Sequence, residues 1–302
     1  MSEPRPVLVG YDGSPASKGA LRWAVEEAEL RGLPLTICHA WHWPYPFRPP
    51  DPSTFDSVWG MAAGVVDDGV RYARELSDGL VVRRRLLKGA APAMLLEAAR
   101  GASVVVIGSR GHGGFEGLSV GSTAVQVPAH ATCPVVVVRR TPAVSGRDGA
   151  PIVVGVDGSP ASEAALAFAF EAALRRECPL RAVCSWWDAG VLPGPDRVPF
   201  TDFDVVQRHA RSRFERAVET WRAEHPKVPV EARFVVEVPR SALLRAAADA
   251  LLLVLGDRGI GSVPEMLLGP VTQAALHEAP CPVAVVPAPV PQQVEDVQEV
   301  TR

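Results

Sequence analysis

The chain has 302 residues, of which 47% are hydrophobic and 22% charged, and its net charge is −3. This length and balance are typical of a globular protein with room for two domains. A net charge this close to zero gives no evidence for a surface that binds nucleic acid or a membrane. We expect the one basic run, Arg83–Arg85, to be the solvated face of a strand.

The cysteines and the hydropathy of the chain exclude further classes of protein. The five cysteines are odd in number and include no C-x-x-C pair, which argues against a disulfide framework and a zinc site. Residues 1–6 contain no apolar core typical of a signal peptide. The longest apolar runs, such as Ala250–Leu255, are far shorter than a membrane span. We therefore expect a cytoplasmic protein.

The first half of the chain alternates strand-like and helix-like segments. Ser14 and Pro15 are typical of a helix N-cap and first turn, and residues 41–57, rich in proline and aromatics, suggest a loop. The predicted strands are residues 7–10, 35–40, 81–87, 104–107 and 135–138. The predicted helices lie between them, the last spanning residues 122–130. This alternation predicts an α/β fold with a mostly parallel, doubly wound five-stranded sheet and helices on both faces.

The second half repeats the first. Residues 7–17 return as 152–162, and residues 131–138 return as 279–286. So long a period indicates a duplicated domain rather than a solenoid. We predict a first domain, a polar linker, a second domain and a polar tail, at residues 1–143, 144–149, 150–288 and 289–302.

A glycine-rich loop follows the buried strand Val104–Ile107. Glycines let backbone amides approach a ligand closely, and the helix that begins after the loop would turn its positive end toward an anion such as phosphate. The spacing fits neither a P-loop nor the dinucleotide fingerprint. A mobile connection without a ligand is the plainer alternative. What does match is G-x2-G-x9-G-S, formed by Gly108, Gly111, Gly121 and Ser122.

The same loop contains G-x-S-x-G, the hydrolase nucleophile elbow, with Ser119 as its serine. The elbow needs its serine on a sharp turn directly after a strand. Here Gly117 lies nine residues beyond Gly108, so the context is wrong. Nor does the sequence group a nucleophile with a base and an orienting residue.

The glycine spacing resembles the ATP-binding signature of the universal stress protein family, and the resemblance covers nearly the whole chain. It implies a flavodoxin-like or Rossmann-like fold whose last strand pairs across a dimer or between tandem domains. Val135–Val138 and Val283–Val286 are the strands we assign to that pairing, both within the chain and in a homodimer.

The resemblance also implies a set of nucleotide contacts in the first half. An aspartate at the place of Asp12 contacts the nucleotide in such proteins, and Asp12 is a candidate for Mg²⁺ that bridges phosphates. Alternatively, Asp12 only organises the strand-to-helix turn. Arg110 would make charge-assisted hydrogen bonds to phosphate. The alternative role for Ser122 is that of a helix N-cap alone. The implied contacts are Asp12, Ala40, Ile107, Gly108, Arg110, Gly111, Gly121, Ser122 and Thr123.

The second half keeps the glycine spacing but changes the residues around it. Pro270 stands where Ser122 stands in the first half, which removes a hydroxyl and a backbone N–H. Asp257 adds a negative charge near the expected polyphosphate. We therefore predict a weaker or lost ATP site here, whose residues are Asp157, Gly256, Arg258, Gly259 and Gly269.

The leading functional prediction is an ATP-binding regulatory protein of the stress response, with slow hydrolysis at most. A nucleotide-independent interaction scaffold is the main alternative, and the altered second half favours it. The third is an enzyme, either an esterase that uses Ser119 or a true ATPase. The tryptophans after the second strand of each half, Trp41, Trp43, Trp186 and Trp187, are expected to cover the core edge rather than stack on a base.

Overall fold

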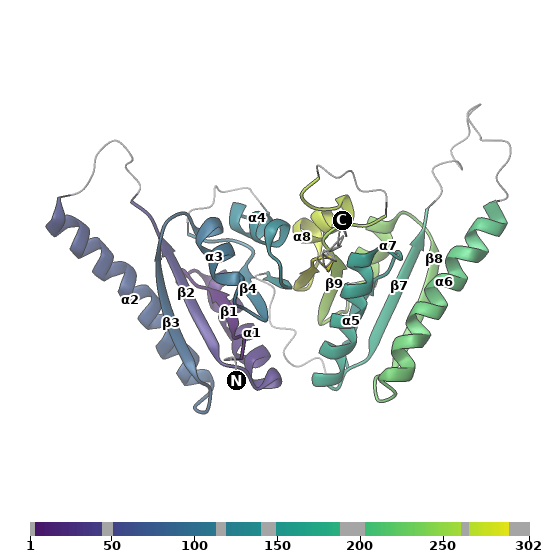
Figure 1. Cartoon of the computed structure of the whole chain (residues 1–302), viewed down its shortest axis with the longest axis horizontal. Coiled ribbons are helices and arrows are strands. Elements are labelled where there is room, and N and C mark those ends of the chain that lie inside the picture. The colour runs from purple at the N-terminus through teal and green to yellow at the C-terminus, as the bar shows by residue number, and fades with distance from the viewer. Residues whose placement is uncertain are drawn as a thin grey trace, which may run out of the picture.

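The computed structural model describes residues 4–43, 51–112, 119–139, 149–187, 203–260 and 266–289. We refer to residues 4–139 as the first half and to residues 149–289 as the second half. Both halves alternate strands and helices along the chain, as the sequence predicts, and α2 and α6 lie at the two outer ends of the molecule (Figure 1).

The first half contains nine of these elements in order. They are β1 (Val7–Gly10), α1 (Pro15–Arg31), β2 (Leu35–Trp41), α2 (Pro52–Leu76), β3 (Val82–Lys88), α3 (Ala91–Ala99), β4 (Val104–Gly108), α4 (Ser122–His130) and β5 (Val135–Val138). The second half repeats them. They are β6 (Ile152–Gly155), α5 (Pro160–Arg175), β7 (Leu180–Trp186), α6 (Phe203–Glu224), β8 (Val230–Val236), α7 (Pro239–Ala246), β9 (Leu252–Gly256), α8 (Pro270–Glu278) and β10 (Val283–Val286).

One predicted boundary is wrong. The expected loop over residues 41–57 ends earlier, because α2 begins at Pro52. Asp51 caps this helix by accepting a hydrogen bond from the backbone N–H of Thr54 at 3.0 Å. An aspartate followed by proline is a helix start, and the surrounding prolines and aromatics obscure that signal in the sequence.

The ten strands form one continuous sheet in the order β3-β2-β1-β4-β5-β10-β9-β6-β7-β8. Every neighbouring pair is parallel except β5 and β10, which pair antiparallel with Val136 opposite Ala284. The predicted pairing between the tandem halves is therefore confirmed. Both strands also pair on their other side, with β4 and β9. A homodimer through these same strands would find no free edge on either strand.

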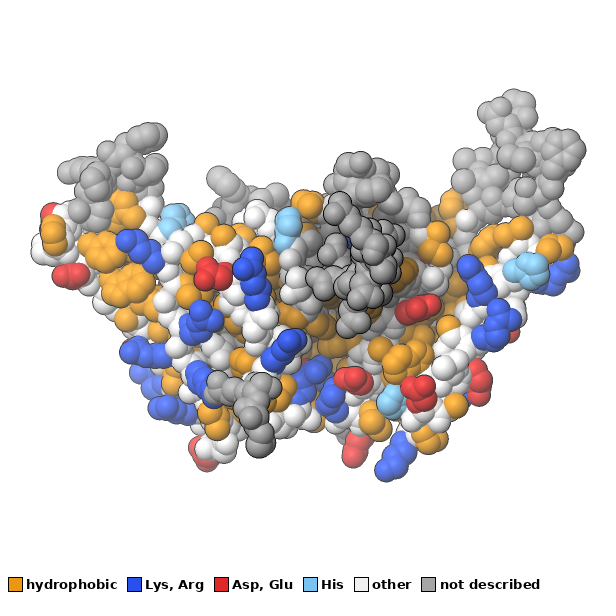
Figure 2. Space-filling view, viewed as in Figure 1, with side chains coloured by type: hydrophobic (Ala, Val, Ile, Leu, Met, Phe, Trp, Pro, Cys, Tyr) orange, Lys and Arg blue, Asp and Glu red, His pale blue; other side chains and the backbone are white. Residues whose placement is uncertain are grey.

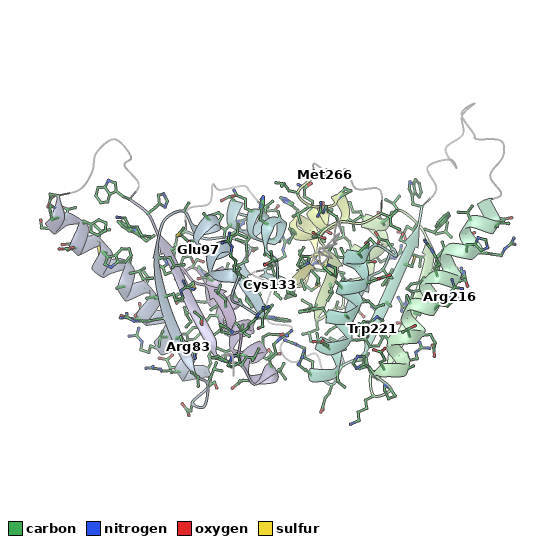
Figure 3. All side chains as sticks on the ribbon, viewed as in Figure 1. Arg83, Glu97, Cys133, Arg216, Trp221 and Met266 are labelled. Atoms are coloured by element: carbon green, nitrogen blue, oxygen red, sulfur yellow. The ribbon has the colours of Figure 1, made fainter. Side chains whose placement is uncertain are left out.

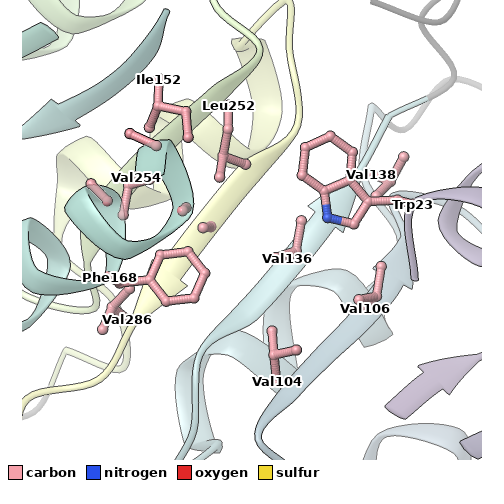
Figure 4. Packing of buried hydrophobic residues seen from close by; sticks show 14 of the residues in the cluster. Trp23, Val104, Val106, Val136, Val138, Ile152, Phe168, Leu252, Val254 and Val286 are labelled. Atoms are coloured by element: carbon pink, nitrogen blue, oxygen red, sulfur yellow. The ribbon is translucent and has the colours of Figure 1, made fainter. Parts of the chain in front are cut away.

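The strands at the centre of each half are buried on both faces, as parallel sheets require. Val7 and Val9 face one apolar core, and Leu8 between them faces the other. Helices α1, α2, α5 and α6 cover the first core, and α3, α4, α7 and α8 cover the second. The first core continues across the seam between the halves, where Trp23 and Phe168 lie on opposite sides (Figure 4).

The outer strand β3 presents its basic residues to solvent. Arg83–Arg85 are all exposed, and Arg84 pairs with Asp67 of α2 at 2.5 Å. Figure 2 shows the blue side chains gathered over this edge of the first half. The run is therefore a solvated strand face, as predicted. Within the described ranges no helix is long and apolar enough to cross a membrane, and all five cysteines are buried free thiols.

A buried ion cluster joins the two halves at the seam. Glu27 of α1 is 2% exposed and lies 2.5 Å from Arg31 and 2.5 Å from Arg176, which follows α5. Each arginine also lies over an aromatic ring of the opposite half, Arg176 over Trp23 and Arg31 over Phe168. Burial alone would raise the pKa of Glu27, but the two guanidinium groups outweigh it and lower that pKa.

We predict that Glu27→Ala lowers the free energy of unfolding at pH 7 by about 3–5 kcal/mol, because two buried arginines lose their counter-charge. The folded-state pKa of Glu27 is depressed, so its stabilisation is complete above the unfolded pKa of about 4.3 and is lost as the pH falls through the folded pKa. Denaturant unfolding from pH 7 to pH 3 measures both effects. Exposed Glu29 of the same helix is the control, and Glu29→Ala should change stability by about 0.5 kcal/mol or less. An equal loss at pH 3 and pH 7 would contradict the assignment.

Candidate functional site

The candidate site of the first half lies where the strand order reverses. The strand order β3-β2-β1-β4-β5 places β1 and β4 side by side. The chain leaves β1 toward one edge of the sheet and leaves β4 toward the other. Ligands in such sheets bind at the carboxyl ends of the strands at this switch point. Asp12 follows β1, and the glycine-rich loop follows β4. The fold therefore brings together two segments that are about a hundred residues apart in sequence.

Asp12 ties these two segments to each other. One carboxylate oxygen accepts a hydrogen bond from the backbone N–H of Ser14 at 3.0 Å, and the other accepts one from His112 at 3.0 Å. Burial would raise the pKa of Asp12, but the hydrogen bonds from Ser14, His112 and Ser17 outweigh it and lower that pKa. The turn-organising role considered for Asp12 is therefore observed, and its contact with a nucleotide or Mg²⁺ stays a prediction.

Close packing explains two of the motif glycines. A Cβ on Gly111 would lie 2.5 Å from an Asp12 carboxylate oxygen, and one on Gly108 would lie 2.8 Å from the backbone of Ala16. Gly121 is different, because the nearest atom to its Cβ would be the Ser109 carbonyl oxygen at 3.6 Å, an ordinary contact. Its φ of −83° also suits any residue. Protein packing therefore does not require a glycine at position 121.

The start of α4 is open. Gly121 is the N-cap, and no side chain caps the helix. The alternative role of Ser122 as N-cap is therefore wrong: Ser122 is the first helical residue, it is exposed, and its hydroxyl bonds to no described residue. Arg110 is exposed beside this helix start and donates from Nε to the Ser119 carbonyl at 3.4 Å. An exposed hydroxyl, a guanidinium and a helix N-terminus suit an anion.

The other two predicted contacts lie at the ends of strands. Ala40 is half-buried near the end of β2, opposite Leu87 of β3. Ile107 is 2% exposed, and its side chain packs in the core near Gly10 and Leu95.

Ser119 meets a residue that the sequence did not associate with it. Its hydroxyl oxygen lies 2.7 Å from Nδ1 of His277 on α8, 158 residues away in the chain. This is the distance of a nucleophile from its base, and no motif in the sequence indicates the pairing. However, no carboxylate among the described residues hydrogen-bonds to the imidazole and orients it, as a hydrolytic triad requires. The contact links the loop of the first half to a helix of the second.

The second half repeats the aspartate turn. Asp157 accepts hydrogen bonds from the backbone N–H groups of Ser159 at 2.9 Å and Ile260 at 2.8 Å. Gly259 lies against the Asp157 carboxylate as Gly111 lies against Asp12. Asp257, expected to repel a polyphosphate, is 7% exposed, and one of its oxygens accepts from the backbone N–H groups of Arg258 and Ala288. Its other oxygen lies 3.6 Å from Nε of Arg258, so the charge of Asp257 is held by backbone amides and an arginine rather than directed at a ligand.

A cavity of about 720 Å³ occupies the site of the second half. Predicted site residues Asp157, Gly256, Arg258, Gly259 and Gly269 all line it. Trp186 and Trp187 line it as well, and the expectation that they cover the core edge rather than stack on a base stays a prediction. In the first half, by contrast, Trp41 packs edge-on against other aromatic rings, namely Trp43, Phe55 and Trp59.

A family model described as the universal stress protein family matches residues 3–139 and, again, residues 150–287. The chain belongs to the universal stress protein family. Two universal stress proteins of Mycobacterium tuberculosis are 35% and 32% identical to it, over 94% and 92% of this chain and 99% and 95% of their own. The crystal structure of a universal stress protein from Archaeoglobus fulgidus has the same fold, with a TM-score of 0.70 at 18% identity, and the match covers 95% of this chain and 97% of that one.

In this universal stress protein we predict that Gly111→Ala lowers the free energy of unfolding by about 1–3 kcal/mol, because the new Cβ displaces the Asp12 carboxylate from the His112 N–H. Denaturant unfolding measures the loss. Gly101→Ala is the control, since its Cβ would meet nothing within 4 Å. Equal effects of the two changes would show that the close approach to Asp12 does not matter.

Proposed function

We propose that this universal stress protein is an ATP-binding regulatory protein of the stress response that holds ATP mainly in its first half. The observation that carries the proposal is Gly121. It stands at the uncapped start of α4 with room for a side chain, so its lack of one is best explained by a ligand that approaches the backbone there.

In this proposal the phosphates lie against Gly121, Ser122 and Thr123 at the positive end of α4, and Arg110 contributes its guanidinium. The nucleoside extends toward the carboxyl ends of β1 and β2, near Asp12 and Ala40, and Ile107 and Gly108 form the end of the strand beneath it. Mg²⁺ would bridge phosphate oxygens near Asp12.

We further propose that binding, rather than turnover, is the output of the site. An efficient general base has a pKa near the working pH. Both oxygens of Asp12 accept backbone hydrogen bonds, which lower the pKa of this carboxyl group further below neutral pH, so Asp12 is a weak base. Hydrolysis would then be slow at most. A regulatory ligand acts by binding one conformation more tightly than another, and the contact between Ser119 and His277 offers a route from the loop to the second half.

The second half is proposed to bind ATP weakly or not at all. At the start of α8, Pro270 and Val271 stand where the first half has Ser122 and Thr123, so both hydroxyls and one backbone N–H are missing. The two domains are proposed to span residues 1–143 and 150–288. An interaction scaffold that needs no nucleotide is the second candidate, and these losses at α8 favour it.

We predict that calorimetric titration with ATP and Mg²⁺ gives micromolar binding of about one ATP per chain. Gly121→Asp should abolish this binding, because it places a carboxylate beside the phosphates. Gly269→Asp is the matched control in the second half and should leave binding unchanged. Both positions have room for the new Cβ, with nearest contacts of 3.6 and 3.4 Å, so loss of the fold would not confuse the result.

Two other outcomes would change the assignment. Two ATP per chain would mean that Pro270 is tolerated and that the second half retains a working site. No binding to the unmodified protein would favour the interaction scaffold instead.

A further inference from the structure

The side chains that line the cavity of the second half differ from those at the equivalent place in the first half. Around Gly13, the atoms nearest to an added Cβ are His112 Nε2 and Val65 Cγ1, at 3.9 and 4.0 Å. Around the equivalent Gly158, they are Arg213 Nη2 and Ile260 Cδ1, at the same distances. An arginine on α6 thus replaces a valine on α2, and an isoleucine replaces a histidine.

The second cavity also extends into space that a tyrosine ring occupies in the first half. In the first half, the ring of Tyr11 packs directly on Gly69 of α2, with Cδ1 only 2.9 Å from the position of a Gly69 Cβ. Tyr11 is 4% exposed and fills the space between β1 and α2. In the second half, Val156 and Ala217 stand at these positions, and both line the cavity together with Leu166 of α5. Val156 is much smaller than Tyr11, and this difference exceeds the one methyl group that Ala217 adds relative to Gly69, so an apolar recess opens where Tyr11 packs in the first half.

The rest of the wall is largely apolar and aromatic. Phe214, Leu243 and Leu255 line the interior, and Trp186 and Trp187 line the side at the end of β7. Trp187 is 50% exposed. Tryptophan and phenylalanine faces favour a flat aromatic guest, which gains from ring contacts beyond the burial of apolar area. The cavity volume falls in the range of sites that enclose a small organic molecule.

The charges in the cavity favour a single negative charge on that guest. The lining includes three arginines and two carboxylates, Arg213, Arg216, Arg258, Asp157 and Glu163. Arg258 pairs with Asp257 at 3.6 Å, so the arginines of α6 are the cations that remain for a ligand. Both oxygens of Asp157 are used by backbone N–H groups. Arg213 forms no ion pair or hydrogen bond with any described residue, and Arg216 extends from the same helix, α6 (Figure 3). These guanidinium groups lie on α6, whereas the phosphate-binding groups are missing from α8, where Pro270 and Val271 line the same cavity.

We propose that the cavity of the second half binds a small aromatic carboxylate, with its ring system in the recess beside Val156 and Ala217 and its carboxylate on Arg213. The two halves then bind different ligands on the same backbone. This proposal goes beyond ATP binding in the first half and does not depend on it.

The probe is biphenyl-4-carboxylate, titrated calorimetrically into the full chain. Its uncharged isostere, biphenyl-4-carboxamide, tests the role of the charge. We expect about one carboxylate per chain, bound roughly tenfold or more tightly than the amide, as a hydrogen bond to a charged group implies. Absence of carboxylate binding, or equal affinity for both compounds, would overturn the proposal.

Two variants introduce side chains of the first half into the second half and show where the probe binds. Val156→Tyr with Ala217→Gly fills the recess as Tyr11 and Gly69 do, and should abolish binding of both compounds. Arg213→Val copies Val65, and should remove the preference for the carboxylate while the amide still binds. Thermal unfolding checks that both variants fold. Unchanged binding to the filled variant would place the probe elsewhere and overturn the proposal.

ATP competition separates this site from the nucleotide site. In the Gly121→Asp variant, the carboxylate should bind as in the unmodified protein, and ATP should not displace it. Displacement by ATP in that variant would show that the second cavity is a nucleotide site, and the proposal of a distinct ligand would fail. Failure of ATP binding in the first half would leave these results unaffected.

Discussion

The antiparallel pairing of β5 with β10 is the contact on which the rest of the molecule depends. It joins two parallel five-stranded sheets into one, and it satisfies the backbone groups that each sheet would otherwise expose at its edge. Above this seam, Glu27 holds Arg31 and Arg176 together, so charges from both halves are buried in one cluster. The pairing also brings α4 and α8 together, and with them Ser119 and His277.

The site of each half depends on the same arrangement of hydrogen bonds between an aspartate and the backbone. An aspartate after the first strand accepts one N–H from its own turn and one from the loop after the fourth strand. A glycine in that loop makes the approach possible. These hydrogen bonds form between groups of the protein itself and need no ligand. They therefore explain why both halves have the aspartate while the side chains around it differ.

Because these hydrogen bonds do not involve a ligand, the other side chains of the two duplicated sites can differ. The first half keeps exposed hydroxyls at the helix start and fills its interior with Tyr11. The second half has a proline at the helix start, an open apolar recess and an added arginine on α6. The functional proposals follow these differences: a polyphosphate in one half and a singly charged aromatic molecule in the other.

The sequence by itself determined the order of strands and helices, the duplication and the glycine spacing. These features depend on local periodicity, caps such as Ser14, and repeated motifs, all of which are visible along the chain. The start of α2 at Pro52 was missed because aromatic and proline residues mask a local cap. Only the tertiary structure decided that Ser119 meets His277 and that Asp257 accepts a hydrogen bond from the backbone N–H of Ala288. Such contacts join residues far apart in the chain, and periodicity carries no information about them. For the same reason, the replacement of Val65 by Arg213 is recognised from their equivalent places beside Gly13 and Gly158 in the tertiary structure.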